Sequence, residues 1–160
     1  MTSGDTMTFT SRPGTYGARQ PGTAVRWLNK LTMRRILRKG GGKMLGGLDA
    51  LVLTTLGKKS GEPRVSPVCW FPGDSGSWLI VASANGAPKN PAWYYNLAAH
   101  PDKAQITIDG QTVPVTAEEL HGEERARAWQ KIADSSARFA AYQNKTDREL
   151  PVIRLTPRAA

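Results

Sequence analysis

The sequence predicts a mainly β fold with helices packed around it. Six apolar segments of strand length recur after residue 49, and most of them are separated by short turns that contain Gly or Pro. Only a few segments have helical periodicity, and no repeat is present. Because strands joined by hairpins pair antiparallel, this pattern favours an antiparallel barrel with helices outside it.

The composition narrows the class of protein. The 160 residues amount to one domain that is large enough to bury a core. Cys69 is the only cysteine and the two histidines are His100 and His121, which excludes a disulfide framework and disfavours a metal centre. The chain has no apolar run of membrane-spanning length and no signal-peptide core, so we expect a cytoplasmic protein.

The net charge of +9 is unevenly distributed. Residues 1–48 carry nine Lys and Arg against one Asp, residues 49–117 carry five of each sign, and residues 118–160 carry eight against seven. A basic arm on a neutral body indicates contact with an anionic partner, either nucleic acid, a lipid surface or a phosphorylated ligand. A solubilising tail is the alternative interpretation.

Three parts follow along the chain. Residues 1–23 are rich in Thr, Ser, Gly and Pro, which predicts a mobile leader. Residues 24–47 form a basic helical arm, in which the apolar stripe changes sides. This predicts either a break near Thr32 or a second half that packs differently from the first, before Gly40–Gly42 end the helix. Residues 48–160 form the globular domain.

The domain is predicted to contain six strands. Their ranges are 50–56, 64–71, 77–84, 103–109, 111–120 and 151–155. Pro67 marks an edge strand or a bulge because it cannot donate a ladder hydrogen bond, and Asp109-Gly110 is a strong hairpin signal. Helices are predicted over 90–100, with Asn90 as N-cap and Pro91 in the first helical position, and over 122–134 and 137–143.

Two segments are candidates for ligand binding. The turn GKKSG, followed by Arg64, places three cations and two glycines where they can hold phosphate or carboxylate oxygens, although an ordinary cationic hairpin has the same composition. The segment ASANG over 82–86 offers small residues against which a flat ring can lie, although a plain exit from a strand is the alternative.

The aromatic side chains allow two interpretations. Phe139 and Tyr142 share a helical face, where they wall a pocket or fill the core. Cys69 has no activating partner nearby in the sequence, which favours a small buried apolar residue over a nucleophile.

The segments LVLTTLGKKSGEPRVSPV, VASANGAPKNPAWYYNL and YQNKTDRELPVIRL occur in one order and spacing. Together they resemble the deazaflavin-dependent nitroreductase family, split-barrel oxidoreductases that use coenzyme F-420. The resemblance covers residues 48–157 and extends weakly back to about Trp27. It implies a six-stranded split β-barrel with flanking helices.

The resemblance also implies a cofactor site. Lys58, Lys59 and Arg64 would face the phosphate and glutamate tail of the cofactor. The residues along the ring system and in the groove beside it would be Ser66, Pro67, Val68, Ala82, Ser83, Ala84, Asn85, Gly86, Asn90, Pro91, Ala92, Trp93 and Asn96.

The substrate face departs from the tyrosine-rich pattern of the family. Its positions here are Cys69, Trp70, Ser136, Phe139 and Tyr142, so one phenol remains. Ser83 and Tyr142 are the candidates for polarising the acceptor, with the proton supplied by solvent.

The function implied is hydride transfer from reduced coenzyme F-420 to a quinone, an activated alkene or a nitroaromatic compound, and the loss of phenols disfavours nitro reduction. The alternatives are a non-catalytic deazaflavin carrier and a nucleic-acid-binding protein. We do not expect nucleic acid, because only Tyr16 and Trp27 are interleaved with the cations of the N-terminal part of the chain. Residues 26–43 would suit an anionic membrane surface, such as the inner face of the plasma membrane. The sequence names neither the acceptor nor the oligomeric state.

Overall fold

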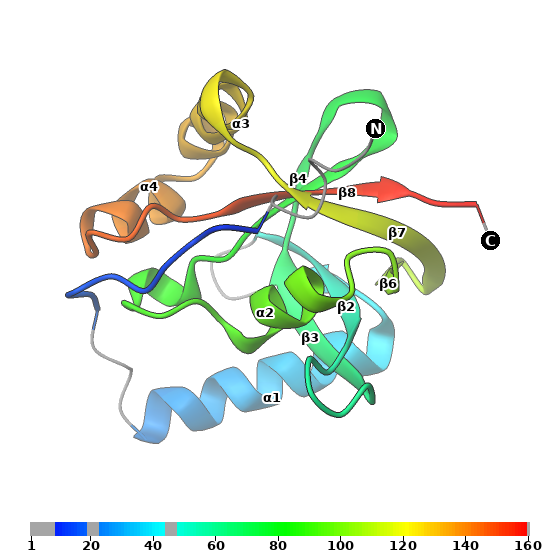
Figure 1. The fold of residues 1–160 in the computed structure, drawn as a ribbon. Coiled ribbons are helices and arrows are strands. Elements are labelled where there is room, and N and C mark those ends of the chain that lie inside the picture. Colours follow the sequence, from blue (N-terminus) through cyan, green and yellow to red (C-terminus); the bar gives the residue numbers. More distant parts are fainter. Residues whose placement is uncertain (1–8, 19–22, 44–47, 160) are drawn as a thin grey trace.

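The computed structural model describes residues 9–18, 23–43 and 48–159 and has an antiparallel sheet with α-helices on both sides (Figure 1). The strands are β1 (Gly42–Lys43), β2 (Asp49–Leu56), β3 (Pro63–Cys69), β4 (Phe71–Pro72), β5 (Trp78–Val81), β6 (Ala104–Ile108), β7 (Gln111–Glu119) and β8 (Val152–Pro157). The helices are α1 (Thr23–Lys39), α2 (Ala92–Ala99), α3 (Gly122–Ser135) and α4 (Ala137–Asn144). The prediction of a mainly β fold is confirmed.

The sheet has the order β1-β2-β6-β7-β8-β5-β4, with β3 paired to the other side of β2. Its six longer strands are the six predicted ones. The predicted strand 64–71 is interrupted at Trp70, which separates β3 from β4. In the part of the chain that the structure describes, no ladder joins β3 to β5, so the sheet is open there and closure into a six-stranded barrel stays a prediction.

Strand β3 is an edge strand, as Pro67 predicts. Directly opposite residues of an antiparallel pair share a face, and Arg64, Ser66 and Val68 lie opposite Thr55, Leu53 and Leu51. Leu51, Leu53 and Val68 belong to the main core. The three β3 side chains at even positions therefore lie on the face that looks toward α2.

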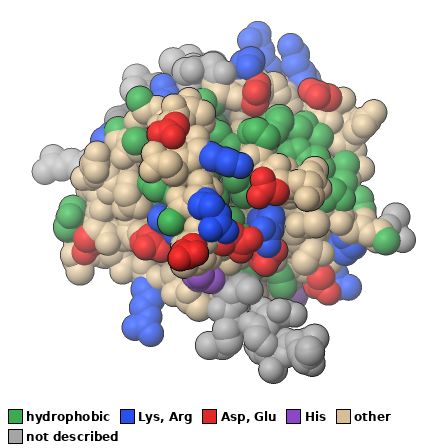
Figure 2. All heavy atoms as spheres, turned by 90° about the horizontal axis from the view of Figure 1, so that it is seen from above, with side chains coloured by type: hydrophobic (Ala, Val, Ile, Leu, Met, Phe, Trp, Pro, Cys, Tyr) green, Lys and Arg blue, Asp and Glu red, His purple; other side chains and the backbone are tan. Residues whose placement is uncertain are grey.

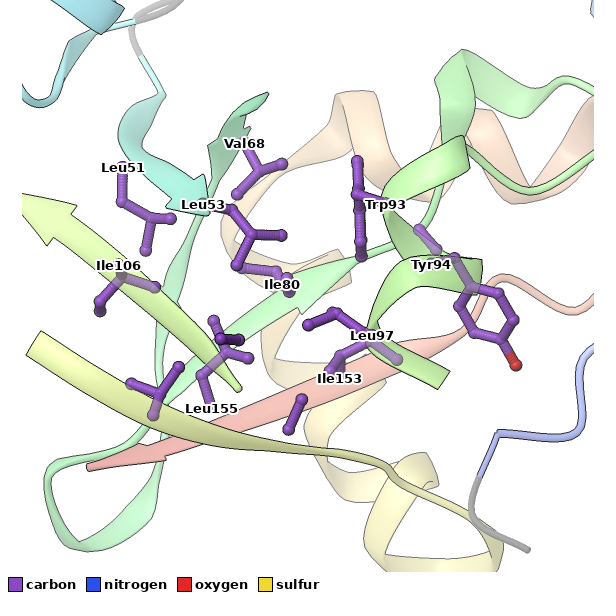
Figure 3. Close-up of a cluster of buried hydrophobic side chains, with 14 residues drawn as sticks. Leu51, Leu53, Val68, Ile80, Trp93, Tyr94, Leu97, Ile106, Ile153 and Leu155 are labelled. Carbon is purple, nitrogen blue, oxygen red and sulfur yellow. The ribbon is translucent and has the colours of Figure 1, made fainter. Parts of the chain in front are cut away.

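The main core lies between the sheet and α2 (Figure 3). Trp93, Tyr94 and Leu97 of α2 pack against leucines and isoleucines of four strands, and Leu97, Leu51 and Ile153 have no exposed surface. Each fully buried aliphatic side chain contributes about 1.5–3 kcal/mol relative to the exposed state. This packing fixes α2 against β2 and β3.

A second cluster joins the far end of the sheet to α3 and α4. Phe71 and Leu79 of the strands meet Ile132 of α3 and Phe139 of α4, with Leu150 completing the cluster. It places α4 beside the turn that follows β5.

Helix α1 is continuous, so the predicted break near Thr32 is wrong. Ile36 is 2% exposed and packs on Ala50 and Val52 of β2, whereas Leu31 and Met33 are exposed. Among the described side chains of α1 only Ile36 is buried, and Leu, Met, Arg and Lys favour a helix even without a continuous apolar stripe. The predicted end is confirmed: Gly40 and Gly41 have φ of +68° and +132°.

Residues 9–18 pack on the domain and are called the N-terminal strap below. Phe9 meets Tyr94 edge to face at 5.5 Å, Gly14 N donates to Pro88 O (2.7 Å) and Ala18 N to Gly86 O (2.8 Å). These residues belong to the predicted leader, whose mobility stays a prediction, and in the structure main-chain hydrogen bonds supply contacts that their composition does not supply by apolar burial. Residues 1–8 and 19–22 of that leader, and 44–47 of the arm, lie outside the described residues.

Candidate functional site

The predicted cationic hairpin connects β2 and β3. Gly57 N donates to Glu62 O (2.8 Å) and Gly61 N to Gly57 O (2.9 Å), which closes the turn, and Gly61 has φ +69°. Lys58, Lys59 and Arg64 are exposed on it. None of the three takes part in an ion pair with any of the residues that the structure describes. The hairpin therefore presents its positive charge outward.

Asn96 attaches this hairpin to α2. Its side-chain oxygen accepts from Lys58 N (2.9 Å), and its Nδ2 donates to Thr55 Oγ1 (3.2 Å). Lys58 Nζ also lies 5.9 Å from the centre of the Tyr95 ring. The structure thus brings together the cationic turn and the helix that the sequence assigned to one site.

The segment 82–86 makes a tight turn at the end of β5. The strand ends at Val81, earlier than the predicted 84, and the 3-10 turn η3 (Ala84–Gly86) follows. Ala84, Asn85 and Gly86 all have positive φ, at 46°, 57° and 83°. Left-handed backbone costs about 1–2 kcal/mol at an alanine, so the surrounding contacts must hold this turn in place.

The N-terminus of α2 differs by one residue from the prediction. Pro91 occupies the cap position and Ala92 begins the helix, so Asn90 is not the N-cap. The Asn90 side chain is buried and donates to Ser11 Oγ (3.0 Å). Trp93 belongs to the core, where Figure 3 shows its ring between α2 and the strands.

The residues predicted along the ring are divided between the two faces of β3. Ser66 and Val68 lie on the α2 face, whereas Pro67 is opposite Val52 on the face toward α1. Side-chain contact with one flat ligand is therefore available to Ser66 and Val68 but not to Pro67. Successive side chains of a strand point to opposite faces, and this alternation is the sequence signal that separates Pro67 from Ser66 and Val68.

The predicted substrate face contains two residues with structural roles. Phe139 is 5% exposed and meets Phe71 at 5.3 Å and Tyr142 at 5.4 Å, both edge to face. Ser136 is buried and caps α4 by accepting from Phe139 N. Cys69, Trp70 and Tyr142 remain partly exposed.

Burial sets the protonation of two side chains on this face. It raises the pKa of the Cys69 thiol to about 11, so the thiol stays protonated near neutral pH and is a poor nucleophile. Burial also raises the pKa of Tyr142, against the opposing effect of the Arg138 guanidinium. The phenol therefore keeps its proton and remains a hydrogen-bond donor.

Sequence reasoning missed Arg148, which lies between α4 and β8. It is 3% exposed and its guanidinium donates to Ala82 O (2.8 Å), Ser83 O (2.9 Å), Ala87 O (3.0 Å) and the Asn90 side-chain oxygen. An arginine between Asp147 and Glu149 has the pattern of a solvated loop, so the sequence carries no signal of this burial.

The sequence model of F420H2-dependent quinone reductases matches residues 27–157. The chain belongs to this family. An F420H2-dependent quinone reductase of Mycobacterium tuberculosis H37Rv is 37% identical over 121 residues, covering 74% of this chain and 80% of that protein. A putative F420H2-dependent quinone reductase of the same strain is 40% identical over 111 residues, covering 69% of this chain and 92% of that protein.

A solved structure of an F420-H2 dependent reductase agrees. It is 37% identical with a TM-score of 0.60, and the match covers 66% of this chain and 92% of the other. This quinone reductase family member is therefore an oxidoreductase whose cofactor is coenzyme F-420. The earlier resemblance to deazaflavin-dependent enzymes is confirmed.

The residues of this reductase fit such a cofactor. An anionic tail requires accessible cations that are not already neutralised, and the β2–β3 hairpin supplies three. A flat ring requires a backbone without bulky side chains, and the turn 82–86 is made of small residues, of which Ala84 and Asn85 reach the surface while Ala82, Ser83 and Gly86 are buried. Among the described residues no group of three or more His, Cys, Asp or Glu could hold a metal ion.

Proposed function

We propose that this reductase transfers a hydride from reduced coenzyme F-420 to a quinone. The quinone gains the hydride and one proton and becomes a hydroquinone, while the coenzyme returns to its oxidised form. The observation that carries the proposal is the exposed cationic hairpin docked through Asn96 onto α2. The relatives named as quinone reductases support the choice of acceptor.

Binding is assigned to three segments in this proposal. Lys58, Lys59 and Arg64 hold the anionic tail, while Ser66 and Val68 line one side of the ring. The turn 82–86 lines the other side, and α2 with Asn90 and Asn96 supports both. Fixing the ring in this way makes the hydride transfer effectively unimolecular, which is the main contribution a protein makes to cofactor chemistry.

Ser83 and Tyr142 are proposed to orient the quinone oxygen. They belong to neighbouring segments, since a Cβ placed on Gly86 would lie 3.0 Å from Tyr142 O. The raised pKa of Tyr142 keeps its hydroxyl proton available for a hydrogen bond to the acceptor. Solvent supplies the proton that completes the reduction.

We further propose that the sheet closes as a six-stranded split barrel. Only Trp70 separates β3 from β4 along the chain. In the sheet, however, β3 pairs with β2 near one end of the strand order, and β4 is the last strand at the other end. The chain therefore passes directly from β3 at one edge of the sheet to β4 at the other edge, across the side that a closed barrel would seal.

The decisive experiment compares acceptors under single-turnover conditions. The enzyme, loaded with reduced coenzyme F-420, is mixed with a short-chain quinone, an enone or a nitroaromatic compound, and reoxidation is followed by absorbance. We expect the quinone to give the highest second-order rate constant of reoxidation. Tight binding of F-420 without reoxidation by any acceptor would favour a carrier, and binding of FMN in its place would refute the cofactor assignment.

Helix α1 is proposed to contact an anionic membrane surface. A groove of about 810 Å³ on the helix is lined by Leu31, Thr32, Arg34, Arg35, Arg38, Lys39 and Lys43. Leu31, Met33 and Leu37 are exposed beside these cations, so the surface combines positive charge with apolar side chains. A lipid-soluble quinone would reach the enzyme at such a surface. No helix within the described residues has the length and apolar character needed to span a bilayer.

A further inference from the structure

Arg148 carries a buried positive charge that is compensated by dipoles. Its guanidinium donates to three main-chain carbonyls and one side-chain amide, and none of its hydrogen bonds goes to a carboxylate among the residues that the structure describes. Burial lowers its pKa, but guanidinium remains charged at neutral pH. Desolvating this charge costs several kcal/mol, so the acceptors around it must be well placed.

These acceptors lie on both sides of the left-handed turn. Nη2 donates to Ser83 O (2.9 Å) before the turn and to Ala87 O (3.0 Å) after it. Nη1 donates to Ala82 O (2.8 Å) at the end of β5 and to the side-chain oxygen of Asn90 before α2. One planar group thus connects the strand, the turn and the start of the helix.

The neighbours of Arg148 hold the outer side of the same turn. Thr146 Oγ1 donates to Tyr16 O (2.6 Å), and Asp147 accepts from Thr15 N (2.8 Å). The strap held in this way donates through Ala18 N to Gly86 O (2.8 Å). In Figure 1 the blue strap runs beside the green segment that contains the turn.

We propose that Arg148 is a positioning residue that shapes residues 82–90 for the ring of coenzyme F-420. This inference rests on the proposed function, in which that ring lies against the turn 82–86. Arg148 does not touch the ring itself, because its donor groups are directed at the carbonyls that hold the turn. Its effect is to fix the consecutive positive φ angles of Ala84, Asn85 and Gly86 in the absence of ligand.

The geometry requires arginine rather than positive charge alone. Five hydrogen bonds leave the guanidinium through three nitrogens in a plane, whereas a lysine ammonium offers three donors at one point. Arg148→Lys therefore retains the charge but cannot connect both sides of the turn.

The test compares Arg148→Lys with Arg125→Lys. Arg125 is the matched control because it is largely buried, donates to Leu150 O (2.8 Å) and lies against Trp129, with none of its contacts in the turn. Affinity for oxidised coenzyme F-420 is measured by its fluorescence, and amide hydrogen exchange is measured over 82–90. We expect Arg148→Lys to weaken binding at least tenfold and to speed exchange in 82–90, and Arg125→Lys to change neither.

The salt dependence of the affinity separates the two proposals. Arg148→Lys should keep the wild-type salt dependence, because the tail still meets Lys58 and Lys59. Wild-type affinity together with wild-type exchange in Arg148→Lys would overturn the positioning role and leave the proposed function intact. Failure of the wild-type enzyme to bind coenzyme F-420 would instead refute the proposed function.

A second variant, Asn90→Ala, keeps the proposal testable if Arg148→Lys does not fold. Asn90→Ala keeps Arg148 and removes one acceptor, so we expect about threefold weaker binding and faster exchange confined to 84–92. If Arg148→Lys does not fold and Asn90→Ala has unchanged affinity and unchanged exchange, Arg148 contributes only to the stability of the fold. That outcome would overturn the proposal.

Discussion

Asn90 and Arg148 show what sequence reasoning can and cannot assign to single side chains. Asn90 has the residue type and position of an N-cap, but the Arg148 guanidinium holds its side-chain oxygen. Propensity counts only local partners, whereas this partner is 58 residues away in sequence. In contrast, Lys58, Lys59 and Arg64 could be placed from the sequence, because a short hairpin brings them together locally.

The double variant Lys58→Ala/Lys59→Ala should bind coenzyme F-420 about tenfold more weakly at low salt, because two exposed cations are removed from an anionic tail. The difference from wild type should shrink as salt is added. Titration of the oxidised cofactor at two ionic strengths measures it, with Lys131→Ala of α3 as control. A loss of affinity that is independent of salt would contradict an electrostatic role.

Asp147 makes docking of the strap dependent on pH. The side-chain hydrogen bond from Thr15 Oγ1 (2.5 Å), with the bond from Thr15 N, holds the Asp147 pKa below its ordinary value of 3.8. A lowered pKa in the folded state means that the stabilisation is present above that ordinary value and is lost as the pH falls through the folded-state pKa.

We therefore expect the amides of Thr15 and Ala18 to be protected at pH 6 and to lose protection as Asp147 is protonated. Protection factors from hydrogen exchange, corrected for intrinsic rates, measure this. Asp147→Asn should show weak protection throughout. Equal protection of the wild-type strap at pH 6 and pH 2.5 would be evidence against the Asp147 contact.

At the scale of elements, strands were easier to predict than the long helix. The apolar segments and Gly or Pro turns located all six longer strands, because these signals are local. The apolar stripe of α1 led to the wrong prediction of a break near Thr32. Only Ile36 of the described side chains of α1 is buried, and helix propensity maintains the rest of the helix. The turn 82–86 was found as a segment, but its left-handed geometry depends on distant contacts.

The glycine in this turn tests its packing. Gly86→Ala adds a Cβ 3.0 Å from Tyr142 O and 3.1 Å from Lys145 Cβ at φ +83°, which combines strain with overpacking. We expect the free energy of unfolding to fall by about 2–4 kcal/mol. Gly61→Ala, at φ +69° with nothing within 4 Å, should lose only about 1–2 kcal/mol. Urea unfolding compares the pair, and equal losses would show that packing against α4 is unimportant.

At the scale of the whole molecule, charge is sorted between two sides. In the view of Figure 1, α1 lies below the sheet and α3 above it. Figure 2 shows the upper face, where acidic and basic side chains intermingle. Arg154 of β8 pairs with Glu118 (2.5 Å) and Glu124 (2.6 Å). Five of the cations that the sequence assigns to the arm line the α1 groove, namely Arg34, Arg35, Arg38, Lys39 and Lys43.

Vesicle binding should follow this asymmetry. Arg34→Gln/Arg35→Gln should lower partitioning onto vesicles with anionic lipid by about 30-fold, at about 1 kcal/mol per cation. Arg127→Gln/Lys131→Gln on α3 should leave it nearly unchanged. Co-sedimentation with anionic and with zwitterionic vesicles measures both. Equal losses for the two pairs would indicate a nonspecific effect of net charge.

The hydrogen bond from Thr146 to Tyr16 spans 130 residues, and Arg148 reaches back to a turn more than 58 residues earlier. During synthesis, residues 82–90 leave the ribosome long before residues 146–148 do. Until then the nascent chain has the cationic hairpin and the strands up to β7, but it lacks β8 and the side chains that fix the turn. Cofactor binding is therefore a late event in the life of the chain, and a ribosome-stalled product that ends before Thr146 would lack both the strand that joins β7 to β5 and the side chains that finish the site.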